Sequence, residues 1–257
     1  MKKLLVCILV VFSLTGLLSG TFLSAQEPNA ATDHFDRGVA ALQKNNPAEA
    51  LESFNAALKL NPDLVEAYIN RGIAELKLEQ YPEAVADFDQ ALELAPDSAA
   101  ALYNRAQAYS RSGLYDKAAA DYTQALKFSS KDWQIYYNRG NAYLDQGKVK
   151  EALADYDQAL KLMPKKPEVL HNRSLAYLHL GQADKALGDA NAVLELNPNF
   201  ARAYFSKAQA MEKLGNKYEA LAAYRQFLKS GNPDADAALL QQALERLKAL
   251  ESVSSKQ

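Results

Sequence analysis

Small and apolar residues recur along this chain every 34 residues, from Ala31 to Asp234, without insertion or deletion. Frames of this period begin at residues 31, 65, 99, 133, 167 and 201. Position 20 of every frame is alanine, position 8 is small, and position 24 is aromatic in five of the six frames (Phe54, Phe88, Tyr122, Tyr156 and Tyr224). In each half of a frame, the apolar residues recur at the spacing of one α-helical turn. This predicts two antiparallel helices per frame.

Glycine and proline mark the ends of these helices. Four frames have glycine at position 15, where a positive φ can close the first helix: Gly113, Gly147, Gly181 and Gly215. Four frames have proline at position 32, which cannot continue the second helix: Pro62, Pro96, Pro164 and Pro198. The small residues at positions 8 and 20 predict that the two helix axes approach closely. We expect the aromatic ring at position 24 to fill the gap to the next frame.

This pattern resembles the tetratricopeptide repeat (TPR), a helix-turn-helix unit of about 34 residues with small, aromatic, alanine and proline residues at these positions. The resemblance implies an all-α fold, a right-handed α-solenoid of six repeats with a C-terminal capping helix. The expected repeats are 31–64, 65–98, 99–132, 133–166, 167–200 and 201–234. Frame one departs from the pattern with His34 at position 4, and frame five departs with Ala190 at position 24.

The two ends of the chain differ from the repeats. Residues 1–25 combine Lys2 and Lys3 with a long apolar stretch and small residues at its end, as in a secretory signal peptide. The same stretch is long enough to serve instead as an uncleaved N-terminal anchor in a membrane. Residues 26–30 form a short linker, 235–252 form an amphipathic helix expected to cap the last repeat, and 253–257 form a tail expected to be disordered.

Composition narrows the functional classes. The formal net charge is −2, which does not favour a nucleic-acid partner. The chain has one Cys, Cys7, and three His, so no disulfide framework is predicted and there is little material for a metal site. His171 and His179 lie two helical turns apart, and we interpret them as surface residues of a groove rather than as ligands. No phosphate-binding loop or nucleophile motif is present, so we expect no enzyme activity and no cofactor.

The resemblance implies that the first helices line a concave groove, and two positions stand out there. Position 6 is asparagine in four successive frames (Asn70, Asn104, Asn138 and Asn172), and position 5 contributes Tyr103, Tyr137, His171 and Phe205. This row is similar to the asparagine ladder of the TPR arm of O-linked N-acetylglucosamine transferase, which holds extended polypeptide by its backbone. An asparagine side chain both donates and accepts, which suits that task. The alternative is that these asparagines find partners within their own helices.

A second resemblance concerns frames four to six. The carboxylate clamp of co-chaperone TPR domains grips a C-terminal carboxylate, and Asn141, Asn172 and Arg202 stand at three of its positions. Tyr137 and Ser206 replace two of its basic residues, so capture of a carboxylate is not the favoured prediction. Asn141 and Arg202 are therefore candidate groove residues beside those above.

Position 7 is basic in every frame, and position 23 is aspartate in four. We expect ion pairs within each hairpin rather than a stripe for an acidic partner. The sequence thus predicts a non-catalytic scaffold, exported to the periplasm or cell envelope, that binds a protein or peptide in its groove. The alternative is a structural subunit of a membrane complex that assembles through its outer face or C-terminal helix.

Overall fold

The structure is a computed structural model that describes residues 30–254. These residues form thirteen α-helices and no β-strand. They belong to two compact units, of which the first ends at Ser130 and the second begins at Lys131. The fold class is therefore the expected one, an all-α solenoid of helical repeats.

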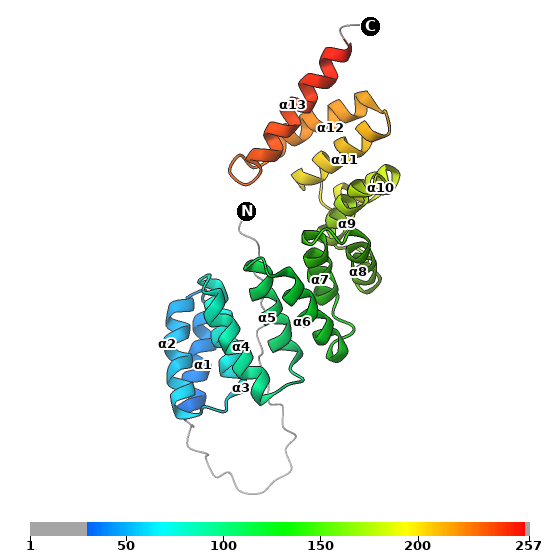
Figure 1. Cartoon of the computed structure of the whole chain (residues 1–257). Helices are drawn as coiled ribbons and strands as arrows, with labels where there is room; N and C mark the ends of the chain where they lie inside the picture. Colours follow the sequence, from blue (N-terminus) through cyan, green and yellow to red (C-terminus); the bar gives the residue numbers. More distant parts are fainter. Residues whose placement is uncertain (1–29, 255–257) are drawn as a thin grey trace, which may run out of the picture. The chain divides into compact units, whose positions relative to one another are not determined.

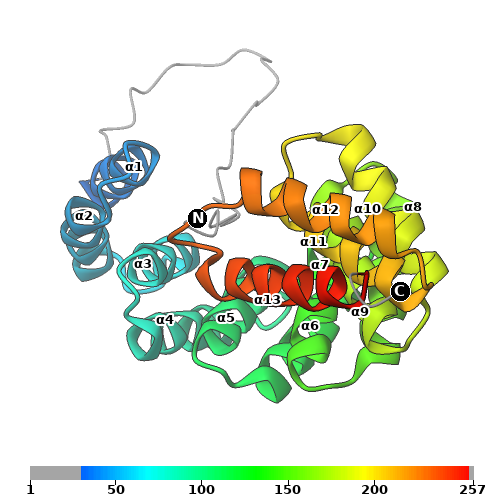
Figure 2. The same cartoon turned by 90° about the horizontal axis from the view of Figure 1, so that it is seen from above.

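The first unit contains three helical hairpins, visible as the blue to green helices in Figure 1. Each hairpin is one repeat, with the first helix antiparallel to the second, and Figure 2 shows the pairs from above. The helices are α1 (Ala30–Gln43), α2 (Pro47–Leu60), α3 (Val65–Lys77), α4 (Tyr81–Leu94), α5 (Ala99–Arg111) and α6 (Tyr115–Phe128).

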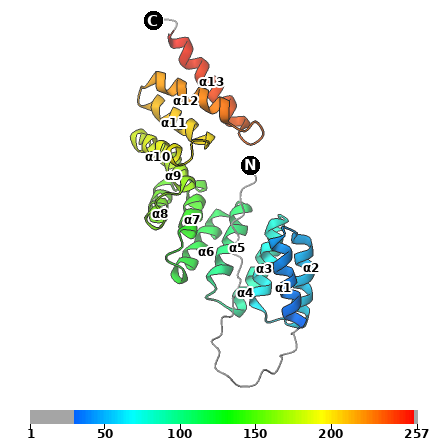
Figure 3. The ribbon, with the colours of Figure 1, turned by 180° about the vertical axis from the view of Figure 1, so that it is seen from behind.

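The second unit contains three further hairpins and one more helix that lies beside α12 (Figures 1 and 3). Its helices are α7 (Trp133–Asp145), α8 (Val149–Leu162), α9 (Pro167–His179), α10 (Ala183–Leu196), α11 (Ala201–Lys213), α12 (Lys217–Ser230) and α13 (Ala237–Ser254). Helix α13 packs against Phe227 and Leu228 of α12 through Leu239, Leu240, Leu247 and Leu250, whereas Leu244 is exposed. The helix continues to Ser254, into the segment that the sequence assigned to a tail.

The two helices of a hairpin touch where a glycine meets an aromatic ring. A Cβ atom added to Gly72 would lie 2.7 Å from the ring of Phe88, and one added to Gly140 would lie 2.8 Å from the ring of Tyr156. The ring at position 24 thus packs on position 8 of its own hairpin, and Phe54 also lies in one core cluster with Ile69 and Ile73 of the next frame. In frame five, where this ring is absent, Ser174 at position 8 donates a hydrogen bond to the Ala186 carbonyl across the hairpin (3.0 Å).

The turn inside each hairpin uses a left-handed residue at position 15. The four predicted glycines have φ between 70° and 78°, which confirms that they close the first helices. In the first two repeats the same position is occupied by Asn45 (φ 57°) and Glu79 (φ 62°). A left-handed conformation is strained for a residue with a Cβ atom, and asparagine tolerates it better than glutamate.

The segment before Ala30 lies outside the described residues, and with it the predicted signal peptide or anchor and most of the linker. Within residues 30–254, no helix combines the length and the apolar character needed to cross a bilayer.

The turn at Glu79 yields a stability prediction. Glu79→Gly should raise the free energy of unfolding by about 0.5–1 kcal/mol, because glycine relieves the left-handed strain at some entropic cost. Chemical denaturation followed by circular dichroism measures this. Gly147→Ala is the matched control and should lower stability instead. An unchanged or lower stability for Glu79→Gly would contradict the prediction.

Candidate functional site

In the first unit, the predicted groove residues are buried. Asn70 in α3 and Asn104 in α5 are completely buried, and each Nδ2 donates to a carbonyl one turn back in its own helix: Glu66 at 2.8 Å and Ala100 at 2.9 Å. Their Oδ1 atoms accept no hydrogen bond from the described residues. Tyr103 is also buried, with its ring centroid 5.8 Å from that of Tyr122. The expected row of freely presented carboxamides is thus corrected for Asn70 and Asn104, whose donors are used locally.

In the second unit, an asparagine at the same position makes different contacts. Asn172 in α9 donates from Nδ2 to Asn141 Oδ1 (2.7 Å) and to the Tyr137 hydroxyl (3.2 Å), both in α7. The hydroxyl of Tyr156 in α8 also donates to Asn141 Oδ1 (2.9 Å). We refer to Tyr137, Asn141, Tyr156 and Asn172 as the Tyr137 cluster. Asn138, which precedes Arg139 in α7, is half-buried.

The neighbours explain why asparagines at one position behave differently. Asn172 follows a repeat that offers polar atoms at positions 5 and 9, namely Tyr137 and Asn141. For Asn70 the preceding repeat has Phe35 and Val39 at these positions, and for Asn104 it has Ile69 and Ile73. Apolar side chains offer no partner, so those two asparagines bond to their own helices instead.

The Tyr137 cluster presents a hydroxyl and a carboxamide on partly buried side chains. The Tyr137 oxygen accepts from Asn172, and the Tyr137 and Tyr156 hydroxyls also have Asn141 and Asn172, respectively, as hydrogen-bonding neighbours. Burial raises the pKa of Tyr137, against the effect of hydrogen bonds from Asn141 and Asn172, so the hydroxyl keeps its hydrogen at neutral pH. The cluster can therefore both donate to and accept from one ligand.

His171 does not lie on the surface as expected. Its ring is buried against Phe200, with 5.1 Å between ring centroids, and its Nδ1 has no partner among the described residues. Burial, and then the positive charge of Arg202, lower the pKa of His171 to about 4, so the ring is neutral at physiological pH. His179 is exposed at the end of α9. Among residues 30–254 no three side chains of the metal-binding types gather into a site.

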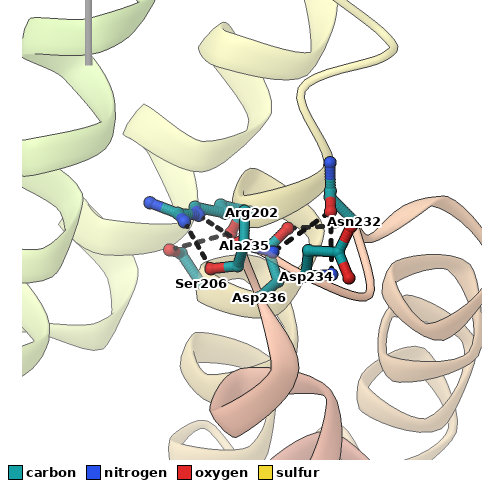
Figure 4. A network of polar contacts seen from close by, with 6 residues as sticks. All are labelled: Arg202, Ser206, Asn232, Asp234, Ala235 and Asp236. Carbon is teal, nitrogen blue, oxygen red and sulfur yellow. Dashed lines mark hydrogen bonds and ion pairs between the residues drawn. The ribbon is translucent and has the colours of Figure 1, made fainter. Parts of the chain in front are cut away.

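The Arg202 side chain donates hydrogen bonds to the turn before α13, as Figure 4 shows. Its Nε donates to Asp236 Oδ1 at 2.5 Å, and its Nη2 donates to the Ala235 carbonyl at 3.1 Å. The Asp236 carboxylate is buried, and it also accepts from the backbone N–H of Asn232 (3.0 Å) in the turn before α13. The sequence interpretation missed Asp236. The signal was present, because Asp236 follows Arg202 by one full period of the repeat.

The predicted ion pairs inside the hairpins are confirmed. In the four repeats that have both residues, the arginine at position 7 donates to the position 23 aspartate through Nε and Nη2, at 2.6–2.8 Å: Arg71–Asp87, Arg105–Asp121, Arg139–Asp155 and Arg173–Asp189. Within the units, Nη1 also reaches position 25 of the preceding repeat: Asn55, Asp89 and Asp157 at 2.6–2.7 Å. The guanidinium groups of these four arginines are thus held in ion pairs within the repeats, and they do not form a basic stripe for a partner.

Glu75 in α3 is an ionisable group that the sequence interpretation missed. It occupies position 11, where the next three repeats have Tyr109, Tyr143 and Tyr177. Burial, and then the negative charge of nearby Asp87, raise the pKa of Glu75 to about 8. Arg71 opposes this shift, but Arg71 is already paired with Asp87.

Comparison with known families identifies the repeat. Models described as TPR repeat or tetratricopeptide repeat match residues 31–64, 69–132, 121–154, 140–181, 167–200 and 202–235. The chain belongs to the tetratricopeptide repeat family. Proteins of this family bind protein or peptide partners, and the fold is that of a protein-interaction scaffold. No curated protein sequence matches the chain.

Solved structures with the same fold include a peptide-binding protein. YrrB, described as a TPR protein with an unusual peptide-binding site, is 25% identical with a TM-score of 0.65, covering 77% of this chain and 100% of YrrB. MamA from Desulfovibrio magneticus RS-1 is 21% identical with a TM-score of 0.63, covering 67% of this chain and 97% of that one. PilF of Pseudomonas aeruginosa is 16% identical with a TM-score of 0.70, covering 82% of this chain and 97% of PilF. The last two show the fold alone.

The raised pKa of Glu75 predicts a pH dependence. An ordinary glutamate titrates near 4.5, so from about pH 4.5 to 8 the folded chain holds a proton that the unfolded chain releases. Glu75 therefore lowers the free energy of unfolding progressively as pH rises through this window. Glu75→Gln should be more stable than the wild type at pH 9 and close to it at pH 4, measured by denaturant titration. Glu52→Gln, which changes an exposed carboxylate, is the control. An equal difference at both pH values would contradict this.

Proposed function

We propose that this chain is a non-catalytic scaffold that binds an extended segment of a partner protein along its first helices, in the periplasm or cell envelope. The observation that carries the proposal is the Tyr137 cluster, whose Tyr137 hydroxyl and Asn172 carboxamide are held together on partly buried side chains of α7 and α9. An extended peptide alternates carbonyl acceptors and amide donors along its backbone. The two groups can therefore bond one peptide backbone whatever its side chains are.

The cluster is held in place before a ligand arrives. Asn141 Oδ1 accepts from both Tyr156 and Asn172, and this joins α7, α8 and α9. Side chains that are already ordered lose little conformational entropy on binding, which favours affinity. The likeness to YrrB supports a peptide as the ligand.

The proposal assigns no reaction to the chain. Four of the position 7 arginines are paired with aspartates, His171 is buried and neutral, and Tyr137 retains its proton. Such groups suit a framework and a hydrogen-bonding surface rather than proton transfer or nucleophilic attack.

The cellular location rests on the N-terminal sequence. Lys2, Lys3 and the apolar stretch that follows are typical of an export signal, and the small residues Ser24 and Ala25 suit cleavage. We expect protein purified from its native host to begin at Gln26 and to fractionate with the periplasm. N-terminal sequencing tests this. A chain that still begins at Met1 in the membrane fraction would favour the anchor, and one that begins at Met1 in the cytoplasm would rule out export.

A second candidate function is supported by exposed apolar side chains at position 30, where the second helices end. In the first unit these are Leu60, Leu94 and Phe128, and in the second they are Leu162 and Leu196. Exposed apolar side chains at a repeated position are typical of a docking surface. They favour a structural subunit that assembles through the ends of its second helices.

Two substitutions test the groove. Tyr137→Phe removes the hydroxyl and should weaken partner binding about 2- to 10-fold, the range expected for one hydrogen bond to the ligand. Asn172→Ala should weaken it further, because the acceptor and the bond to Asn141 are both lost. Partners co-purified with the wild type are measured by titration, with Asn199→Ala at an exposed site as the control. Thermal unfolding checks that each variant is folded.

The outcome also separates the two candidate functions. If both groove variants bind like the wild type while Leu162→Ser with Leu196→Ser loses the partner, the chain assembles through position 30. In that case the groove proposal is wrong.

A further inference from the structure

The carboxamide of Asn141 in α7 is held in one orientation by two donors. Its Oδ1 accepts from the Tyr156 hydroxyl (2.9 Å) and from Asn172 Nδ2 (2.7 Å). An amide oxygen has two acceptor sites, so this Oδ1 has no capacity left. Turning the carboxamide by half a rotation would place Nδ2, which only donates, against the Nδ2 donors of Asn172. Asn141 therefore keeps Oδ1 toward α8 and α9 and directs Nδ2 away from them.

The Nδ2 of Asn141 supplies a donor on the groove side. This atom carries two N–H bonds, and the neighbouring Tyr137 hydroxyl oxygen takes up one of them at most. Asn141 is a candidate groove residue at position 9, and its side chain is partly exposed. Within residues 30–254, one N–H bond of Asn141 is therefore available to an acceptor on a ligand.

Tyr156 helps to fix this orientation from the core of the hairpin. Its ring is buried and passes under Gly140, where an added Cβ would lie 2.8 Å away, so its hydroxyl reaches Asn141 on the groove side. A buried hydroxyl needs a hydrogen-bond partner, and Asn141 provides the acceptor. Without this hydroxyl, only the bond from Asn172 would hold the Asn141 oxygen.

The residues at positions 9 and 24 match one another in all six repeats. Three repeats combine a polar residue at position 9 with tyrosine at position 24: Gln107 with Tyr122, Asn141 with Tyr156, and Gln209 with Tyr224. The other three combine an apolar residue with one that has no hydroxyl: Val39 with Phe54, Ile73 with Phe88, and Leu175 with Ala190. Tyrosine at position 24 therefore occurs only where position 9 has a side chain that can form hydrogen bonds.

The fourth repeat is the one in which this tyrosine orients a partly exposed side chain at position 9. In the third repeat, Gln107 is buried. In the sixth, the Tyr224 hydroxyl donates to Glu212 (3.0 Å) rather than to position 9. Phe205, a candidate groove residue of that repeat, is also buried, with its ring centroid 5.9 Å from that of Tyr224. The oriented donor among these three repeats is thus Asn141.

The charges near the Tyr137 cluster favour a neutral acceptor. Besides burial, the negative charge of Glu168 raises the pKa of Tyr137. Besides burial and the neighbouring Tyr137, the charge of Asp145 raises the pKa of Tyr156. Both carboxylates therefore act on the cluster, and they would repel a ligand carboxylate. A peptide carbonyl accepts a hydrogen bond without carrying a net charge.

We propose that Asn141 donates a hydrogen bond to a backbone carbonyl of the bound segment, and that Tyr156 is the positioning residue that orients it. The inference rests on the proposed function, which supplies the extended backbone, and it adds a contact beside Tyr137 and Asn172. It also gives this contact a direction, because Asn141 can offer the ligand only a donor.

The single tryptophan of the chain allows a direct test. Trp133 lies beside Tyr137, with 6.2 Å between ring centroids, so its fluorescence reports binding at the cluster. The probe is the blocked peptide N-acetyl-tetraalanine amide, which offers backbone groups without polar side chains. It is titrated into the full chain.

Asn141→Asp is the decisive variant, because it keeps an acceptor for Tyr156 and Asn172 but replaces Nδ2 by an oxygen. It should weaken binding of the probe about tenfold or more and leave thermal unfolding nearly unchanged. Asn199→Asp makes the same change at an exposed site of the same unit and should alter neither. Binding by Asn141→Asp at the wild-type affinity overturns the inference.

A double-mutant cycle tests the positioning role of Tyr156. Tyr156→Phe removes only the hydroxyl and should weaken binding of the probe about 2- to 10-fold. Added to Asn141→Asp it should weaken binding no further, because the donor that it orients is already lost. An equal loss in both backgrounds would mean that Tyr156 does not act through Asn141, and the positioning role would be wrong.

A second double variant separates positioning from stability. Asn141→Val with Tyr156→Phe reproduces the pair of the first repeat, Val39 with Phe54. It should regain the thermal stability lost in Tyr156→Phe, because no polar group is then left without its partner, but it should not regain binding. Recovery of binding together with stability overturns the inference.

The results also distinguish this inference from the proposed function. If Tyr137→Phe and Asn172→Ala weaken binding of the probe while Asn141→Asp does not, the proposed function stands and the inference fails. If the probe does not bind the wild type, recognition of the backbone fails and the inference fails with it.

Discussion

The structure depends on one steric contact, the approach of the two helices where a small residue at position 8 lies under the ring at position 24. Glycine is required in frames such as the second, because a Cβ on Gly72 would overlap the ring of Phe88. The same contact also determines which charged side chains meet. Arg71 and Asp87 immediately precede these residues in the sequence, so bringing Gly72 under Phe88 also brings the guanidinium to the carboxylate. Packing and ion pairing are two results of one register.

The ion pairs in turn link one hairpin to the next. Each of the four paired arginines uses Nε and Nη2 within its hairpin, and in Arg105 and Arg173 the remaining Nη1 donates to an aspartate of the preceding repeat. A planar guanidinium is suited to this, since its donors point in fixed directions toward separate carboxylates. Exposed pairs contribute little to stability, but the aspartates within the hairpins are largely buried, and losing the arginine would leave a carboxylate unpaired.

The sequence was sufficient to predict whatever depends on spacing alone. The hairpins, the glycines that end first helices and the Arg–Asp pairs all follow from fixed places within one repeated frame. The candidate site was predicted less well, because a side chain's partner depends on its neighbours as well as its position. Asn70 bonds to its own helix for want of a polar neighbour, and Arg202 bonds to Asp236, which lies beyond the last complete frame. His171 is buried by Phe200, the last residue of its own frame, at a position that is not aromatic in any other frame.

Specific binding in such a chain therefore requires departures from the repeat. An asparagine present in four repeats at the same position would give four equivalent contacts only if its surroundings were also equivalent. They are not, because only some repeats carry polar side chains at positions 5 and 9. Tyr137 and Asn141 make Asn172 part of a hydrogen-bonded cluster, which the Tyr156 hydroxyl joins from α8. The regular residues build the framework, and the irregular ones determine where a partner can be recognised.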